Sequence, residues 1–287
     1  YTQVGTIWFG QGSSAAYSSI FPTTGALFLI VNNSTMDVLF ETVVQFPLTK
    51  ALLLREYKNG NFTLLAYFLS YVFSNIILSA INSLLLAVPV YTMVGLSLEP
   101  SSVATFIGTL MLMSFLGSLL GIAVGAVAGD ISSARAAVVP TLVPLLIFSG
   151  YLIPYKSIPV YFKWAYYASF FQYCFGLLQV NELAGREYHE DCPMQIAGEE
   201  LYESLRSRIL SDPSVPPNVS AWFDAHTSVQ LPANCTGDDF LAAAGLFPTP
   251  YGGVGGYFAI ICSYVAIMLV AAFILLRCRV VEMAYYS

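Results

Sequence analysis

Charged residues are scarce in this sequence: they make up only 10% of 287 residues, whereas an average soluble domain has about 25%. This scarcity argues against a water-soluble enzyme. Basic residues are the scarcer kind, 11 against 17 acidic ones, and the formal net charge of −6 argues against a nucleic-acid partner, because binding phosphates takes a basic face. Hydrophobic residues make up 57% of the chain. The composition therefore predicts an all-α polytopic membrane protein.

Nucleotide-binding and catalytic motifs are also missing. No lysine follows a glycine, so the phosphate-binding G-x-x-x-x-G-K-[ST] loop is absent. G-x-S-x-G, H-E-x-x-H and G-x-G-x-x-G do not occur either. His189-Glu-Asp-Cys192 resembles a metal cluster, but adjacent residues in an exposed acidic loop cannot all converge on one ion. We expect no metal site, no cofactor and no catalytic residue in this chain, and an intramembrane enzyme is only a weak alternative.

Four or five segments are long and apolar enough to cross a hydrocarbon core of about 30 Å, which takes about 20 helical residues. They are expected near 26–46, 64–96, 103–128, 136–152 and 256–276. Residues 1–9 are apolar, too short to span and begin without Met, so we expect them to be the end of a first helix that starts upstream. Residues 158–179, rich in Tyr, Trp and Phe, predict a re-entrant or interfacial pair of short helices.

The basic residues orient these spans, because Lys and Arg favour cytosolic loops. Lys50, Arg55 and Lys58 place the loop after the first full span inside, and Arg277 and Arg279 place the C-terminal tail on the same side. We divide the chain into transmembrane helices (1–155), re-entrant helices with an extracellular loop (156–255), and a last transmembrane helix with a cytosolic tail (256–287).

The long segment before the last span is expected outside the cytosol. It holds most of the acidic residues and two glycosylation sequons, at Asn218 and Asn234. Cys192 and Cys235 lie in the same segment, where a disulfide can persist. A bridge between these two cysteines is favoured, and two free thiols are the alternative.

Asn33, Asp37 and Glu41 recur at every fourth position of the first full span, which places an amide and two carboxylates on one stripe of a helix. Acids near the bilayer centre cost about 2.5–3.5 kcal/mol on insertion scales. The stripe therefore lines a cavity in a transport pathway, or belongs to a satisfied interhelical network. Partners for such a network occur at helical spacing in the next span: Asn75, Ser79 and Asn82.

Glycine and proline mark two further helices. The third full span has glycine at every fourth position from Gly117 to Gly129, which predicts a flat face for close helix packing. Pro140 and Pro144 each remove a backbone donor from the fourth span. They predict a bend, which is either a moving part beside a cavity or a static kink.

The order of these parts resembles the transmembrane domain of G-subfamily ATP-binding cassette (ABC) exporters, the White and breast cancer resistance protein group, over essentially the whole chain. The resemblance is carried by Leu53-Leu-Arg55-Glu56-Tyr57-Lys-Asn-Gly60, Ile147-Phe-Ser-Gly150-Tyr-Leu-Ile-Pro154, Phe171-Gln-Tyr-Cys-Phe-Gly-Leu-Leu-Gln-Val-Asn181-Glu182 and Cys235-Thr-Gly-Asp-Asp-Phe240. It implies an ABC-2 type domain of six helices, the first truncated here, that dimerises around a substrate cavity. Cys192 and Cys235 match the intrachain cysteine pair of this family.

The resemblance also implies roles for single residues. The cavity is expected to be lined by residues of the first and fourth full spans: Asn33, Met36, Val143 and Leu146. Met36 replaces an aromatic clamp of the multidrug member. Tyr151 and Leu152 correspond to a hydrophobic plug that gates the cavity. The coupling loop that receives motion from a nucleotide-binding domain is expected around Lys50, Arg55 and Glu56. Thr49 stands where many members carry Glu.

The function that the resemblance implies is ATP-driven export of lipophilic or amphipathic small molecules (xenobiotics, pigment precursors or lipids) by alternating access, and the expected location is the plasma membrane. ATP and Mg are expected at a nucleotide-binding domain outside this chain, fused upstream or separate. A second transmembrane domain, identical or different, and membrane lipid are the other expected partners. A sterol or phospholipid exporter of the same family, and an ATP-independent pore or receptor, remain as alternatives.

Overall fold

The computed structural model describes residues 2–14, 16–128, 130–153, 155, 158–189, 235–244, 246 and 251–286. This part of the chain is almost entirely helical. In chain order its elements are α1 (Thr2–Ile7), η1 (Gln11–Ser13), η2 (Tyr17–Ser19), α2 (Ile20–Lys58), α3 (Leu64–Val94), α4 (Pro100–Val127), α5 (Ile131–Ile147), η4 (Val160–Phe162), α6 (Lys163–Ala168), α7 (Phe170–Leu183), β1 (Glu187–Tyr188), β2 (Cys235–Thr236), α10 (Gly237–Ala244) and α11 (Val254–Tyr286).

Among the described residues, four helices are long and apolar enough to cross a membrane. The apolar spans are Tyr17–Thr49, Leu64–Val94, Pro100–Val127 and Val254–Val281. They agree with four of the segments expected from hydropathy. The chain is therefore an integral membrane protein built from helical spans.

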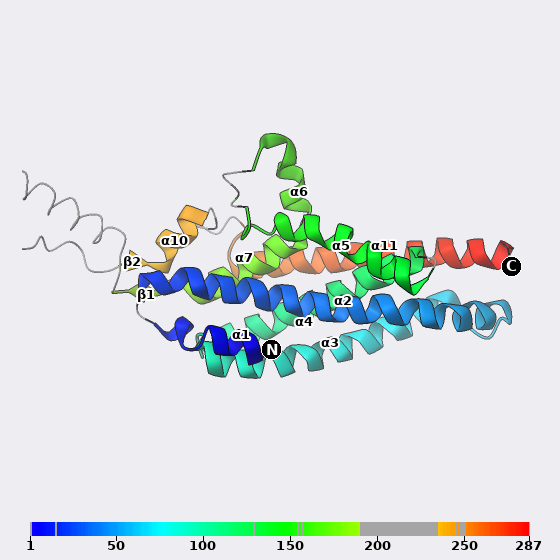
Figure 1. Cartoon of the computed structure of the whole chain (residues 1–287), viewed down its shortest axis with the longest axis horizontal. Coiled ribbons are helices and arrows are strands. Elements are labelled where there is room, and N and C mark those ends of the chain that lie inside the picture. Colours follow the sequence, from blue (N-terminus) through cyan, green and yellow to red (C-terminus); the bar gives the residue numbers. More distant parts are fainter. Residues whose placement is uncertain are drawn as a thin grey trace, which may run out of the picture.

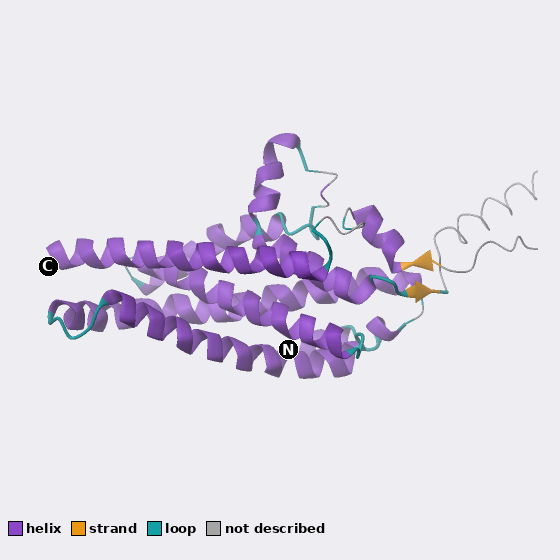
Figure 2. Ribbon diagram, turned by 180° about the vertical axis from the view of Figure 1, so that it is seen from behind, coloured by secondary structure: helices purple, strands orange, loops and turns teal. Residues whose placement is uncertain are grey.

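The long helices run side by side, as Figures 1 and 2 show. α4 is the central one, because it packs against α2, α3, α7 and α11. The turn between α2 and α3 lies at the same end of the bundle as the C-terminal end of α11, and β1 and β2 lie at the opposite end (Figure 1). This arrangement matches the two ends that the basic residues predict.

The predicted glycine face of α4 packs directly on α2. A Cβ atom at Gly117 would lie 2.7 Å from the backbone oxygen of Thr35, and one at Gly121 would lie 2.7 Å from the Cβ of Thr42. Neither contact is possible for a larger residue without a shift of the helices. Beside this face, the hydroxyls of Ser34 and Ser114 lie 2.7 Å apart in a buried contact. Small residues and buried hydroxyls thus fix α2 against α4.

The fourth predicted span, 136–152, is wrong at both ends. α5 begins at Ile131, because Asp130 caps it: the Asp130 carboxylate accepts from the Ser132 backbone nitrogen at 3.1 Å. It ends at Ile147, and Gly150 then reverses the chain with a φ of 89°. The helix has only 17 residues and is not among the four long spans. Tyr151 and Leu152 therefore lie in a turn and not on a helix.

The aromatic segment after this turn forms two short helices, as predicted. α6 and α7 are separated at Ser169, where the backbone becomes extended (φ −84°, ψ 116°). The Ser169 hydroxyl donates to the Leu145 carbonyl at 2.7 Å, which ties this break to the end of α5. α7 is buried along nearly its whole length, whereas η4 and α6 present Tyr161 and Trp164 at the surface.

Candidate functional site

We call the end of the bundle that carries β1 and β2 the outer end, and the end with the turn between α2 and α3 the inner end (Figure 1). The turn after α5 is held by an aromatic cluster toward the outer ends of α2 and α7. The Tyr151 ring stacks on Phe28 of α2 with ring centroids 4.5 Å apart, and it meets Phe175 of α7 edge-on at 5.6 Å. Gly25 makes room for the tyrosine, because a Cβ atom there would lie 3.0 Å from the Tyr151 hydroxyl. Tyr151 therefore plugs a space inside its own chain, whereas the neighbouring Leu152 is 54% exposed.

An apolar cavity of about 280 Å³ opens beside this cluster. Its walls come from the outer end of α2, the turn after α5, α7 and α10. The residues that characterise it are Phe21, Thr24, Tyr151, Gln172, Phe175, Gln179 and Phe240. Two amide side chains among aromatic rings suit an amphipathic ligand, because such sites combine a mostly apolar wall with a few polar groups.

The four residues expected to line the central cavity lie on neighbouring helices, since α2 packs along α5. Asn33, Met36 and Leu146 are half-buried and Val143 is 41% exposed. None of the four lines the outer cavity. Their role in a cavity between two transmembrane domains stays a prediction.

The polar stripe of α2 faces α3 across a cleft of about 240 Å³. Asp37 and Glu41 line it from α2, opposite Asn75 and Ser79 of α3. The Gln45 side chain donates to a Glu41 carboxylate oxygen at 3.3 Å. The structure thus brings together the two sets of polar residues that the spacing offered as partners.

Not every residue of the stripe lines the cleft. Asn33 is absent from its wall, whereas Gln45, twelve positions further on, belongs to it. Four residues turn a helix by about 40° beyond one full turn. The predicted stripe therefore winds around α2, and Asn33 faces a different neighbour from Glu41.

The expected coupling loop lies at the other end of α2. This helix has 39 residues and continues past its apolar span to Lys58. Arg55 and Glu56 form an ion pair of 3.6 Å, and the Asn61 side chain donates to the Glu56 carboxylate. The Arg55 side chain is 73% exposed, so this end presents charge at the surface. The side chain of Lys50 lies outside the described part of the structure.

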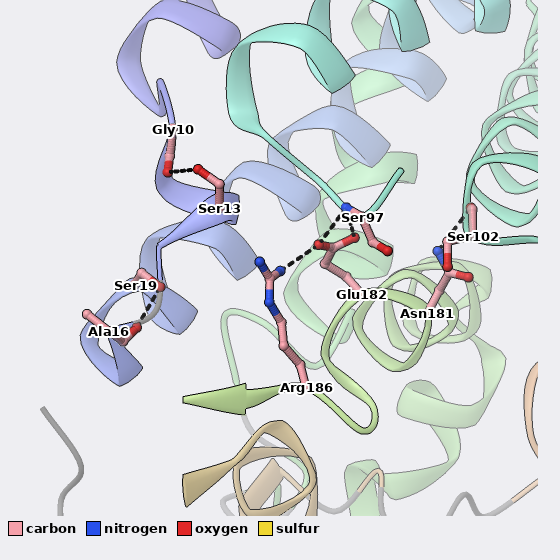
Figure 3. Close-up of polar contacts among 9 residues, drawn as sticks. All are labelled: Gly10, Ser13, Ala16, Ser19, Ser97, Ser102, Asn181, Glu182 and Arg186. Atoms are coloured by element: carbon pink, nitrogen blue, oxygen red, sulfur yellow. Dashed lines mark hydrogen bonds and ion pairs between the residues drawn. The ribbon is translucent and has the colours of Figure 1, made fainter. Parts of the chain in front are cut away.

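A polar network at the outer end was not foreseen from the sequence, although Asn181-Glu182 closes one of the motifs quoted above. Figure 3 shows Glu182 accepting from the Ser97 backbone nitrogen at 3.0 Å and from Arg186 at 2.9 Å. Asn181 donates to the Ser102 carbonyl at 3.1 Å. The end of α7 is thereby fastened to the turn between α3 and α4.

Glu182 lies outside the four long spans, and its side chain is 2% exposed. Burial raises its pKa to about 7, although Arg186 and the Ser97 nitrogen oppose the shift. The i, i+4 spacing of Glu182 and Arg186 is the one signal that could have revealed the pair. Figure 3 also shows the nearby turns of the N-terminal segment, in which Ser13 and Ser19 donate to backbone oxygens three residues earlier.

Several exterior predictions concern residues outside the described ranges. Cys235 lies in β2, opposite Tyr188 of β1. Cys192, Asn218 and Asn234 lie in residues 190–234, which the structure does not describe, so the disulfide and the glycosylation sites stay predictions. Among the described residues, no group of three or more His, Cys, Asp or Glu side chains could hold a metal ion.

Comparison with known proteins agrees with this architecture. Residues 2–183 match the ABC-2 type transporter family. The chain is 26% identical to the protein white of Ceratitis capitata over 181 residues (63% of this chain, 26% of that protein). It is 28% identical to ABC transporter G family member 7 of Arabidopsis thaliana over 202 residues (70% and 28%).

A third relative, the broad substrate specificity ATP-binding cassette transporter ABCG2 of Mus musculus, is 25% identical over 269 residues, which is 93% of this chain and 36% of that protein. The chain thus spans about a quarter to a third of the length of these curated relatives. The long helical spans, the two short helices that follow α5 and the match to the family all agree. The chain belongs to the ABC-2 type transporter family, as a transmembrane domain of its G subfamily.

Proposed function

We propose that this chain is the membrane-spanning part of an ATP-driven exporter of lipophilic or amphipathic small molecules, and that it works by alternating access in the plasma membrane. The observation that carries the proposal is the apolar outer cavity with Tyr151 in its wall. ATP is hydrolysed with Mg at a nucleotide-binding domain outside this chain. The residues described here bind the cargo, gate its exit and couple its movement to ATP hydrolysis.

α2 supplies a physical link between gate and coupling end. Phe28, which stacks on Tyr151, and Arg55 belong to the same uninterrupted helix. At 1.5 Å per residue, they are about 40 Å apart along its axis. A tilt or rotation imposed on the charged inner end would reach the aromatic cluster through this helix, which stays helical across Pro47. Opening of the Tyr151 contact would release cargo outward.

Dimerisation is part of the proposal. Phe40 of α2, with Val139 and Val143 of α5, is more than two-fifths exposed in the single chain. A second transmembrane domain, from an identical or a different polypeptide, would cover this apolar surface and complete the central cavity beside Asn33. The interface would then rest on helix packing.

The first test is the mass of the native polypeptide in its own membrane after deglycosylation. We expect a band well above the 31.2 kDa of this chain, because a fused nucleotide-binding domain adds mass. Peptide sequencing of the additional region should then find the phosphate-binding loop. A band at 31.2 kDa that co-purifies with no ATPase subunit would refute the ATP-driven exporter.

The second test measures transport by the complete protein in inside-out vesicles with a neutral lipophilic dye. We expect ATP-dependent uptake that falls several-fold in Tyr151→Ala and persists in Tyr151→Phe, because the stacked ring forms the gate. Tyr161→Ala is the matched control, since Tyr161 is 72% exposed on η4. Equal transport by Tyr151→Ala and Tyr161→Ala would contradict the role of the gate.

A further inference from the structure

The wall of the cleft between α2 and α3 is acidic among the residues that the structure describes. Asp37 and Glu41 contribute two carboxylates, one helical turn apart, and no Lys or Arg is among the described residues that line the cleft. Acidic side chains within a membrane span are costly and mark cation or substrate sites when they face a polar cavity. The charge of the wall therefore favours a cation.

A second observation points to a bound ligand independently of the acids. Ser79 is 1% exposed and lines the cleft, and its hydroxyl has no hydrogen-bond partner among the described residues. Buried hydroxyls are almost always paired, because an unpaired one loses its hydration without compensation. Four residues further along α3, Ser83 shows the usual solution, as its hydroxyl donates to the Ser79 carbonyl at 2.7 Å.

The rest of the wall defines what kind of cation fits. Val38, Leu78, Ile81 and Leu85 supply apolar surface beside the polar groups. The volume of about 240 Å³ exceeds that of a bare ion and lies just below the usual range of small-molecule pockets, about 300–1,000 Å³. Ser79 stands at the middle of the Leu64–Val94 span, so a ligand reaches it from the lipid or from the transport pathway. An apolar body with a charged head suits this position.

We infer that the α2–α3 cleft binds a protonated primary amine that carries an apolar body. A primary ammonium group has three hydrogens to donate, which match the carboxylates of Asp37 and Glu41 and the hydroxyl of Ser79. Such a molecule is either a small exported amine or a lipid with an amine headgroup. The inference names a substrate class for the proposed exporter and rests on that function only for the transport of the ligand, since binding needs no ATP.

The test is equilibrium binding of radiolabelled 2-phenylethylamine to the complete protein in phosphatidylglycerol nanodiscs without ATP. We expect saturable binding that neither 2-phenylethanol nor 3-phenylpropionate displaces, because these analogues lack the positive charge. Glu41→Gln and Asp37→Asn should each weaken binding about tenfold, since charge-assisted hydrogen bonds are about twice as strong as neutral ones. Ser79→Ala should weaken it by a smaller factor.

Matched controls are available on the same elements. Ser83→Ala removes a buried hydroxyl of α3 that is not in the cleft wall, and Glu99→Gln removes an exposed carboxylate before α4. Neither should change binding. Variants are compared only as monodisperse protein with the melting temperature of the parent, and Glu41→Asp, which keeps the charge, should retain part of the affinity.

The source of the amine is decided by repeating the measurement in nanodiscs that contain phosphatidylethanolamine. Loss of probe binding there identifies a lipid headgroup as the resident ligand, and unchanged binding identifies a small amine. No saturable binding to the parent protein, or equal binding by Glu41→Gln, Asp37→Asn and both controls, would overturn the inference. If uptake of the neutral dye remains ATP-dependent in the same preparation, the proposed export function survives that result.

Discussion

Replacing Gly117 by alanine tests the close packing of α4 on α2. A Cβ atom at this position would lie 2.7 Å from the Thr35 backbone oxygen, which cannot rotate away as a side chain can. Overpacking of this kind costs about 1–3 kcal/mol. It is offset in part by helix propensity, because alanine is favoured over glycine by about 1 kcal/mol inside a helix.

Gly108→Ala on the same helix separates the two effects. There the new Cβ would meet the Phe258 ring at 3.5 Å, an ordinary van der Waals contact. Both variants gain the same propensity, so the difference between their unfolding free energies isolates the clash at Gly117. We expect Gly117→Ala to be less stable than Gly108→Ala by about 1–3 kcal/mol.

The measurement is denaturant unfolding of the complete protein in mixed micelles, followed by circular dichroism, with thermal melting as a second ranking. Gly121→Ala is expected to behave like Gly117→Ala, because its Cβ would lie 2.7 Å from the Thr42 Cβ. Equal stability of Gly117→Ala and Gly108→Ala would refute the idea that α2 and α4 are in fixed backbone contact.

Three other changes test separate contacts. Burial raises the pKa of Glu182 to about 7, so the folded chain holds a proton that the unfolded chain loses near pH 4.5. The melting temperature should therefore fall as the pH rises from about 5 to 7.5. This fall should be smaller in Glu182→Gln. Asp130→Ala removes the cap of α5 and should cost about 1 kcal/mol in unfolding free energy, whereas Asp130→Asn should cost less. Ser34→Cys with Ser114→Cys should form a disulfide on mild oxidation, since the native hydroxyls lie 2.7 Å apart. Transport should persist after oxidation, because α2 and α4 move together, and a loss that reduction restores would contradict this.

The apolar runs predicted the long spans well because each is a local property of the chain. α3, expected over 64–96, is Leu64–Val94, and it ends where Gly95 adopts a φ of 77°. The end of α5 was not predicted correctly, because residues 148–152 are apolar enough to continue a membrane-spanning helix. Only the left-handed backbone of Gly150 shows that the chain turns there. The hydropathy of a segment carries no information about the backbone angle of one residue within it.

The site was less predictable than the spans, since it depends on contacts between helices. The spacing of Asp37 and Glu41 indicated one polar face with possible partners in the next span, but it did not show that Asn33 leaves this face. The resemblance pointed to Tyr151 as part of a plug between two domains. Its stack on Phe28, in the same chain, depends on the room left by Gly25 and could not be read from the motif.

α2 connects every feature with a proposed function. It carries Phe28 in the outer cluster, Asp37 and Glu41 in the cleft, and Arg55 at the inner end. Its face toward α4 is fixed by backbone contact, whereas its face toward α3 borders an open cleft. A close-packed interface resists sliding more than one with unfilled volume. Motion received at the inner end should therefore carry α2 and α4 together, and change the width of the α2–α3 cleft while the Tyr151 contact opens.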